Sequence, residues 1–349
     1  MSQTQQQNAN DEEIYTFIVE WYDSIADLKR KYRLTYWVED GSLSMYDLSK
    51  HKLFLKRIVN KDIKFPNDLY IGKTVVIYSR QLKIIDYNDL FTKNKFESIS
   101  KLYHIGFVGF QSFTTFLSSQ FNDNSEPFHF KSVKSVKIND TIQRYFNGNI
   151  NNSNILIFCE FVGSKKIQQT LDKCLNNKQE ETSFCGKMFD ETNDSELIFE
   201  INKNYQTSAT LQENESLICL IKPHSLLLTP NIMNDITNEG FRISAITTRK
   251  LTLNEAKEFM EVYDGVIKEY NYLIEQLLSG TVIVLQVQCI HDNTFTQFRN
   301  FVGPKDPEIA KYIRPNTLRA KYGVDRIKNG VHCTDLKEDG NLESKFFFA

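Results

Sequence analysis

The sequence predicts an α+β protein in which an antiparallel β module precedes two α+β units of similar layout. Three observations support this. Residues 13–90 contain short runs rich in β-branched and aromatic residues, separated by turn residues. Residues 102–212 and 215–349 show the same order of predicted strands and helices. With 349 residues, 41% of them hydrophobic, the chain is long and apolar enough for two or three packed domains.

The first part of the chain is predicted as a β module over residues 13–91. Its strands are "IYTFIVEWY", "KYRLTYWV", "LSMYDL", "LFLKR", "KTVVIYS" and "LKIIDY". A turn at Gly41 separates the second run from the third, and a hairpin turn is predicted at Arg80 and Gln81. The polar residues 1–12 are predicted to be a disordered tail, and the polar stretch 92–101 a linker.

This module resembles the DM-ten domain, a module of ciliary and flagellar proteins. The resemblance rests on the elements "FLKR", "YIG" and "IYSRQLKIIDY", which occur in the same order as in that family. It implies a pleckstrin-homology-like β fold and an association with axonemal microtubules.

The third part, residues 215–349, has the clearest pattern of elements. The strand "LICLIK" precedes a helix with Thr229 as N-cap and Pro230 at its first position, which ends at Gly240. The strand "FRISAIT", a capping box at residues 252–255 and an amphipathic helix over 270–277 follow. The strand "TVIVLQVQ", short helices, a strand reaching His332 and a final helix complete the order. This order predicts a ferredoxin-like unit without a dinucleotide-binding fold.

The second part, residues 102–212, repeats this order with "YHIGFVGF", "SVKSVKI", "NILIFCEFVG" and "DETNDSELIFE". It has no histidine between His129 and His224, and no lysine or arginine between Lys101 and Lys131. Because phosphate chemistry needs a nucleophile and cations, we interpret this unit as a structural domain.

Candidate chemistry concentrates around His332 in the stretch "NGVHCTD", which also contains Asn329 and Thr334. A half-buried histidine at a strand end is the plain alternative. Three cations elsewhere in the unit, Lys222, Arg299 and Arg319, favour a different interpretation, although each alone is equally explained as surface charge. Phosphoryl transfer needs cations around the moving phosphate, a nucleophile in line and, for histidine, a carboxylate that orients the ring.

With these residues noted, residues 215–349 resemble the nucleoside diphosphate kinases. The blocks "LIKP", "GFRI", "SGTVIVL", "FRNFVGPKDPE", "RPNTLRAKYG" and "NGVHCTD" occur in that family's order. The resemblance implies that His332 is the phosphorylated nucleophile and that Glu343 orients it. It further implies that phosphates and sugar are bound by Lys222, Arg299, Arg319, Asn329 and Thr334. Magnesium is expected to enter with the nucleotide's phosphates, with no protein cage for a metal.

The sequence departs from the family pattern at several positions. Met260 stands where the family has an active-site tyrosine, Lys305 near its phosphate-loop threonine, and His224 where aspartate is common after Lys-Pro. Because the loss of one preorganised donor costs on the order of 10²–10³ in rate, we expect a weakened site. Tyr263 and Tyr270 are two candidates for stacking the base.

Bulk properties exclude several classes. A net charge of −2 argues against binding of DNA or RNA through a basic field. The six cysteines form no C-x-x-C pair, which indicates buried thiols in a reducing compartment. No apolar run approaches the roughly 20 residues that cross a bilayer. We therefore expect no nucleic-acid partner and no membrane.

Taken together, the three parts resemble the ciliary, multidomain class of nucleoside diphosphate kinases, the seventh of that family. The resemblance implies tubulin, doublet microtubules, neighbouring axonemal proteins and the γ-tubulin complex as partners, and a location in cytoplasm, cytoskeleton and axoneme. Three hypotheses remain open at this stage: a structural microtubule inner protein, an active kinase using His332, and a nuclease side activity that no residue supports specifically.

Overall fold

The computed structural model divides the chain into two compact units, residues 1–99 and 100–349. The predicted tail at residues 1–12 lies outside the described part of the chain. The structure describes residues 13–23, 26, 28–61, 63, 65, 68–99, 101–121, 128–146, 154–176, 184–203, 207–209, 216–289, 291 and 293–349.

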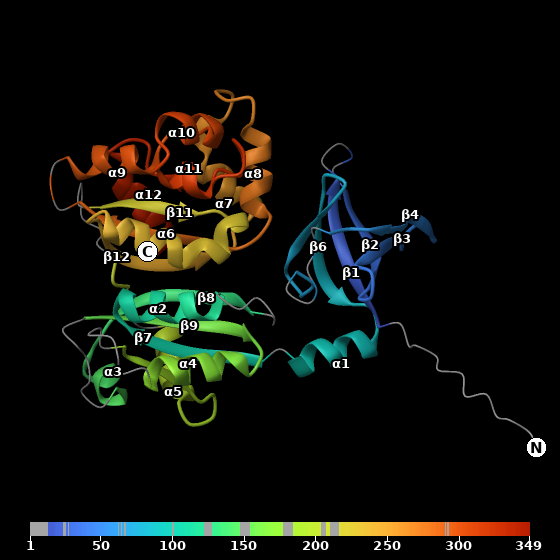
Figure 1. Ribbon diagram of the computed structural model, residues 1–349, viewed down its shortest axis with the longest axis horizontal. Coiled ribbons are helices and arrows are strands. Elements are labelled where there is room, and N and C mark those ends of the chain that lie inside the picture. The colour runs from blue at the N-terminus through green and yellow to red at the C-terminus, as the bar shows by residue number, and fades with distance from the viewer. Residues whose placement is uncertain are drawn as a thin grey trace, which may run out of the picture. The chain divides into compact units, whose positions relative to one another are not determined.

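The first unit is built on a six-stranded antiparallel sheet in the order β4-β3-β2-β1-β6-β5 (Figure 1). Side chains alternate along β1, so that Tyr15, Phe17 and Val19 point into the core while their neighbours do not. The elements are β1 Ile14–Asp23, β2 Leu28–Trp37, β3 Ser42–Asp47, β4 Lys52–Val59, β5 Thr74–Ile77, β6 Arg80–Tyr87 and α1 Leu90–Ile99.

The linker predicted at residues 92–101 is wrong. Residues 92–99 belong to helix α1, and residue 101 begins strand β7. The helix begins after Asp89, whose carboxylate accepts a hydrogen bond from the backbone N–H of Thr92 at 2.7 Å. Its Phe96 is buried and stacks edge-on against Tyr15 and Phe17. A polar sequence hid this helix because only one of its faces contacts the sheet.

The hairpin between β5 and β6 is confirmed, but it turns two residues earlier than predicted. Tyr78 and Ser79 form the turn, with φ values of 46° and 63°. Two consecutive residues in the left-handed region are typical of a two-residue hairpin turn, which glycine or asparagine usually marks. Neither is present, so the sequence contained no local signal for its position.

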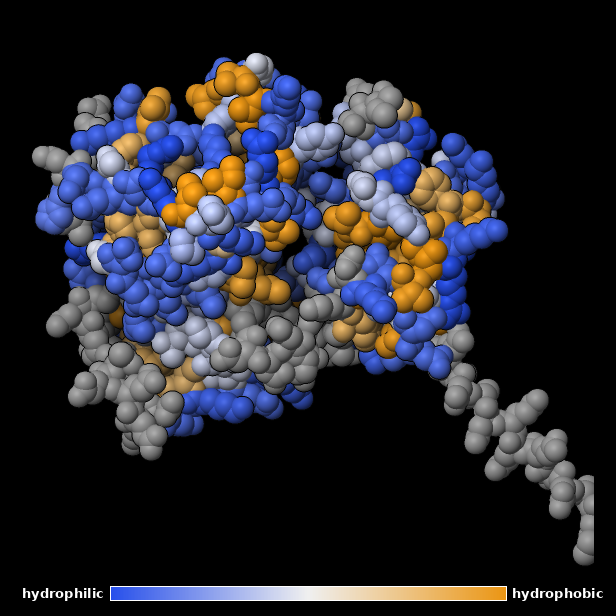
Figure 2. Space-filling model, turned by 45° about the horizontal axis from the view of Figure 1, so that its top comes forward, coloured by the Kyte–Doolittle hydropathy of each residue, from blue (hydrophilic) through white to orange (hydrophobic). Residues whose placement is uncertain are grey.

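Strand β4 is an edge of this sheet and carries apolar side chains at the surface. Leu53, Phe54 and Val59 are exposed, and Figure 2 shows apolar surface on this unit. Lys52 and Lys56 lie on the same strand. Lysines on an edge strand limit unspecific strand pairing, whereas an exposed apolar group at such an edge is typical of a protein-binding surface.

The second unit is built on an eight-stranded sheet in the order β10-β7-β9-β8-β12-β13-β11-β14. The first four strands and their helices come from one half of the unit: β7 Lys101–Val108, α2 Gly109–Phe121, β8 Phe128–Lys137, α3 Asp140–Tyr145, β9 Ile155–Gly163, α4 Lys166–Asn176, β10 Gly186–Phe189 and α5 Ser195–Lys203. The remaining elements are β11 Ser216–Ile221, the 3₁₀ helix η1 Pro223–Leu228, α6 Thr229–Asn238, β12 Arg242–Arg249, α7 Leu253–Phe259, η2 Glu261–Tyr263, α8 Tyr270–Leu278, β13 Val282–Gln288, α9 Thr294–Val302, α10 Pro307–Ile313, α11 Leu318–Tyr322, β14 Val331–Cys333 and α12 Asp339–Phe348.

The two halves share a strand order and one core. From the edge of the sheet inward, the first half has the order β10-β7-β9-β8 and the second half β14-β11-β13-β12. In each half this is the fourth, first, third and second strand of that half. They meet at β8 and β12, where the hydroxyl of Ser135 accepts a hydrogen bond from the backbone N–H of Ile246 at 2.8 Å. Helices α2 and α6 pack on the same side of this junction (Figure 1). One apolar cluster contains residues of both halves, from Phe107 and Phe116 to Ile232 and Ile236.

The local signals of the second half have mixed outcomes. The capping box of α7 is confirmed, with Thr252 and Glu255 each accepting a hydrogen bond from the other's backbone. The prediction of Thr229 as N-cap is wrong, because η1 runs directly into α6 and leaves no extended residue at the junction. The Thr229 hydroxyl instead donates to the carbonyl of Leu226 at 2.6 Å.

No helix in the described ranges is long and apolar enough to cross a membrane.

Candidate active site

His332 lies in the middle of the short edge strand β14, opposite Leu220 of β11. Its side chain is only 8% exposed and is enclosed by aromatic rings. The ring of Phe259 stands edge-on to it at 5.1 Å between centroids, and that of Tyr263 at 6.3 Å. Burial lowers the pKa of His332, with Glu343 opposing and Arg319 reinforcing the effect. The imidazole is therefore neutral at pH 7 and has one unprotonated nitrogen.

Glu343 of α12 faces this ring. Its Oε1 lies 3.9 Å from His332 Nε2, within ion-pairing range, and its Oε2 is buried without a hydrogen-bond partner among the described residues. A carboxylate beside Nε2 favours the tautomer with the proton on that nitrogen. The lone pair then lies on Nδ1, which becomes the nucleophilic atom.

The position of Glu343 depends on close packing between α12 and β11. A Cβ atom on Gly340 would lie 2.3 Å from the carbonyl oxygen of Ser216, so alanine there would force the helix away from the sheet. We expect Gly340→Ala to lower the free energy of unfolding by roughly 2–3 kcal/mol and phosphorylation of His332 by about 10²-fold through misplacement of Glu343.

Urea unfolding and the rate of histidine labelling measure the two effects. Gly240→Ala is the matched control, because Gly240 has a φ of 93° and no atom within 4 Å of its ideal Cβ. That change should cost about 1 kcal/mol through backbone strain and leave labelling unchanged. Equal labelling by both variants would contradict the assigned role of α12.

Lys222 lies at the end of β11, where the sequence placed it. Its side chain is 4% exposed, and Nζ donates to the carbonyl of Ile327 at 2.8 Å. Burial, with repulsion from Arg319, lowers the pKa of Lys222 to about 7. Among the described residues no carboxylate pairs with it, so its charge is available to an anion.

The two arginines reach the same place from α9 and α11. Arg319 is 6% exposed and donates to the carbonyls of Val331, at 3.1 Å, and Gly303, at 2.9 Å. No carboxylate of the described chain pairs with it. Arg299 donates to the carbonyl of Thr334 at 2.7 Å and to Asp335 at 2.6 Å. Both guanidinium groups are therefore fastened to the β14 segment that carries His332.

Asn329 and Thr334, on either side of His332, differ in the hydrogen bonds that their side chains make. The Asn329 amide donates to the carbonyl of Lys305 at 3.1 Å, while its Oδ1 is buried without a partner in the described structure. Thr334 is fully buried, and its hydroxyl accepts the backbone N–H of Ile218 at 2.9 Å. Because its side chain is fully buried, Thr334 has no surface for the predicted phosphate contact, and its role is corrected to pairing β14 with β11.

The structure gives roles that the sequence did not predict to residues at or near the positions that depart from the family pattern. His224 holds the loop before His332, because its Nε2 accepts the backbone N–H of Gly330 at 3.2 Å. Tyr263 and Tyr270 are both buried in a core cluster with Met260, and neither presents an open ring face for a base. The only sequence signal for these roles was the unusual residue itself.

The arrangement combines a neutral, oriented imidazole with three cations that have few anionic partners. Such a constellation can accept a phosphoryl group on Nδ1 and stabilise the charge of a polyphosphate. Within the described ranges no group of three His, Cys, Asp or Glu side chains is placed to hold a metal ion.

The described residues of the first half form no such constellation on the corresponding face. Its edge strand β10 carries Lys187 and no histidine, and Lys187 Nζ donates to the carbonyl of Tyr145 at 2.9 Å. Phe158 and Phe189 fill the adjoining core.

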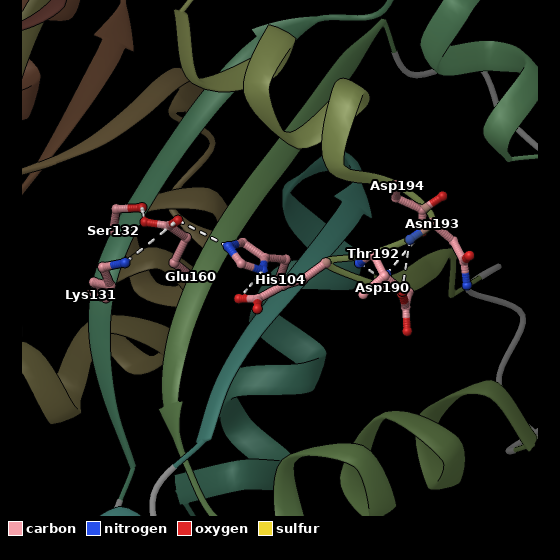
Figure 3. Close-up of polar contacts among 9 residues, drawn as sticks. His104, Lys131, Ser132, Glu160, Asp190, Thr192, Asn193 and Asp194 are labelled. Carbon is pink, nitrogen blue, oxygen red and sulfur yellow. Dashed lines mark hydrogen bonds and ion pairs between the residues drawn. The ribbon is translucent and has the colours of Figure 1, made fainter.

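A polar cluster occupies another part of that half. Figure 3 shows His104, Lys131, Ser132 and Glu160 pointing toward one another across β7, β8 and β9. Glu160 accepts from His104 Nε2 at 3.1 Å and from the Ser132 hydroxyl at 2.7 Å. Both carboxylate oxygens are occupied, and hydrogen bonds led by that of His104 lower the pKa of Glu160 to about 2. The cluster therefore holds three strands together.

Glu160→Gln is expected to lower the free energy of unfolding at pH 7 by roughly 2–3 kcal/mol. The pKa is lowered in the folded protein, from 4.5 to about 2, so the contribution is present above pH 4.5 and is lost as pH falls toward 2. Urea unfolding of both proteins should show the difference shrinking below pH 4.5. Glu258→Gln, at an exposed position of α7, should change stability little, and a loss of the same size there would contradict this account.

Comparison with known proteins adds the following. A family model described as nucleoside diphosphate kinase matches residues 215–349. Over 377 aligned residues the chain is 32% identical to "Nucleoside diphosphate kinase homolog 7" of Rattus norvegicus, covering 97% of this chain and 94% of the relative. It is 29% identical to a nucleoside diphosphate kinase of Aquifex aeolicus over 140 residues, 39% of this chain and 94% of that protein. A crystal structure of the Aquifex aeolicus enzyme matches 39% of this chain with 28% identity and a TM-score of 0.36.

Proposed function

The chain belongs to the nucleoside diphosphate kinase family, and from this premise we propose that its C-terminal half transfers the γ-phosphate of a nucleoside triphosphate to a nucleoside diphosphate. The observation that carries this is the neutral imidazole of His332, with Glu343 beside one nitrogen. Near it lie Lys222 and Arg319, which bond to backbone carbonyls and pair with no carboxylate of the described chain. The route is ping-pong, through a phosphohistidine.

In the first half-reaction, Nδ1 of His332 attacks the γ-phosphorus. The new N–P bond forms as the bond from phosphorus to the β–γ bridging oxygen breaks, and the electron pair leaves with the nucleoside diphosphate. The proton stays on Nε2, where Glu343 stabilises the positive charge that the ring acquires. Lys222, Arg299 and Arg319 neutralise the transferred and leaving phosphates. A second diphosphate reverses these steps.

Magnesium would enter bound to the nucleotide and supply additional charge neutralisation of the phosphates. The carboxylates near His332 fit this view. Asp335 is already paired with Arg299 at 2.6 Å, and Glu343 faces His332. With no group of three His, Cys, Asp or Glu side chains in the described ranges placed to hold a metal ion, the phosphates themselves would be its main ligands.

Transfer is expected to be weak. Met260 is buried and supplies no hydrogen bond where the family pattern has a tyrosine hydroxyl. One missing donor corresponds to a rate lowered by about 10²–10³. This departure also favours the second candidate, a catalytically silent scaffold that retains only the fold.

The remaining parts of the chain complete the proposal. Residues 102–212 are a degenerate nucleoside diphosphate kinase-like domain in tandem with the C-terminal one; the shared strand order supports this. Residues 13–91 are a DM-ten domain of pleckstrin-homology-like fold; the resemblance of their sequence supports it.

The biological role that we propose is that of a structural protein inside ciliary doublet microtubules. Its partners are tubulin, neighbouring axonemal proteins and the γ-tubulin complex, and its locations are the cytoplasm, cytoskeleton and axoneme. The DM-ten resemblance and the exposed apolar edge of β4 support this. The full chain should sediment with stabilised microtubules, and Phe54→Asp should reduce this. A chain that stays in the supernatant would contradict the proposal.

Labelling tests the kinase directly. The purified chain is incubated with ATP labelled at the γ-phosphate, and the protein-bound label is analysed for acid lability. The expected label is acid-labile and is removed by a chase with GDP, with formation of labelled GTP. A folded chain that acquires no such label would remove the kinase and leave the scaffold.

A further inference from the structure

Lys305 lies on the segment that connects α9 to α10, beside the site but outside the constellation described above. Two site residues fasten this segment by its backbone. Arg319 donates to the carbonyl of Gly303 at 2.9 Å, and the Asn329 amide donates to the carbonyl of Lys305 at 3.1 Å. The backbone of Lys305 is therefore fixed relative to His332 by the same groups that surround the nucleophile.

The ammonium group of Lys305 rests on an aromatic ring of the site. Its Nζ lies 4.2 Å from the centroid of the Tyr263 ring, and that ring is itself edge-on to His332. The side chain as a whole is exposed, so a ligand can reach it. No carboxylate in the described part of the chain pairs with Lys305, and cation–π contact is a weak hold compared with an ion pair.

Polar atoms close to this contact also lack partners. The Tyr263 hydroxyl and Asn329 Oδ1 are buried without a hydrogen bond from the described residues. Buried polar atoms without partners are rare and indicate a missing polar group. Of these two, the Tyr263 hydroxyl can donate to a phosphate, whereas the amide oxygen can only accept from another part of a ligand. Partial burial of the ammonium group, followed by repulsion from Arg319 and Arg299, lowers the pKa of Lys305, as expected for a cation beside other cations. An anion placed among them would relieve this repulsion.

We propose that Lys305 is a phosphate-binding residue of this site, held ready on the ring of Tyr263 and directed at the phosphates beyond the first of a bound nucleotide. The inference rests on the proposed function for the presence of a nucleotide. It adds a charged contact at a position where the family pattern has a threonine. Lys305 thereby makes affinity depend on the number of phosphates, while Tyr263 acts as its positioning residue.

Equilibrium binding of ADP and AMP, by titration calorimetry with displacement for the weaker ligand, tests this without any phosphoryl transfer. We expect Lys305→Gln to weaken ADP binding about tenfold and AMP binding less than about twofold, since AMP lacks the phosphate that Lys305 would contact. Lys305→Arg keeps the charge and the contact with the ring, and should restore most of the ADP affinity. Lys311→Gln removes the same charge from an exposed position of α10 and is the control.

The outcomes distinguish the role of Lys305 in phosphate binding from the proposed kinase activity. ADP affinity unchanged by Lys305→Gln, an equal loss for AMP, or an equal loss in Lys311→Gln would overturn the role of Lys305, whether or not His332 is labelled. If ADP binds as expected but no phosphohistidine forms, the kinase fails and the role of Lys305 stands. A wild-type chain that binds no ADP would overturn both.

Discussion

Replacement of His332 by alanine is expected to abolish the acid-labile label and to lower phosphoryl transfer by roughly 10⁴-fold or more, because the covalent route has no second nucleophile. Phe259 and Tyr263 enclose the ring. The other histidine near it, His224, has its Nε2 engaged by the backbone N–H of Gly330 at 3.2 Å. The residual rate should be that of direct transfer to water or acceptor in the cationic pocket.

The measurement needs a matched histidine variant and a check of folding. His291→Ala removes an exposed histidine that lies after β13, and its label should equal that of the wild type. Circular dichroism and urea unfolding verify that His332→Ala is folded, because the change leaves the Glu343 carboxylate buried without its neighbour. Transfer by a folded His332→Ala variant at the wild-type rate would refute the phosphohistidine.

Replacement of Lys222 by methionine is expected to weaken nucleotide binding and at the same time to stabilise the fold. An ammonium group that is 4% exposed, bonded to one carbonyl and repelled by Arg319, is unfavourable in the protein without ligand. A methionine of similar length fills the same space without charge. Because methionine cannot form the ion pair that the Lys222 ammonium group would make with phosphate, nucleotide affinity should fall by about 10²-fold.

The effect of Lys222→Met on the free energy of unfolding should depend on pH. The pKa of Lys222 falls from 10.5 to about 7 on folding, so between these values the unfolded chain binds more protons and the stability of the wild type rises with pH. Below pH 7 the folded lysine is charged and the full penalty applies. Lys222→Met should therefore raise the free energy of unfolding by roughly 2–4 kcal/mol at pH 6, and the gain should decline as pH rises toward 10.

Urea unfolding at pH 6 and pH 9, together with ADP titration, measures both effects. Lys257→Met changes an exposed lysine of α7 in the same way and should alter neither stability nor affinity appreciably. A Lys222→Met variant that is less stable than the wild type at pH 6 would show that the buried ammonium group stabilises the fold.

The strands and helices of the second unit were predictable because their signals are local. The capping box of Thr252 and Glu255 involves residues three apart. The stretch "TVIVLQVQ" is rich in β-branched apolar residues, which predicts a buried strand. Helix α1 was missed because its single buried ring, Phe96, packs on residues 79 and 81 positions earlier, Phe17 and Tyr15. No window of sequence contains that contact.

The sequence alone determined the family pattern, the candidate nucleophile His332 and the charged residues available to it, because these depend on residue type and spacing. Only the tertiary structure decided which of them meet. Pairing of β14 with β11 buries Thr334 completely. The side chains of Arg319 and Asn329 donate to the backbone carbonyls of Gly303 and Lys305 and so hold Lys305 at the site. The physical reason is that burial and pairing of charge depend on segments that only folding brings together.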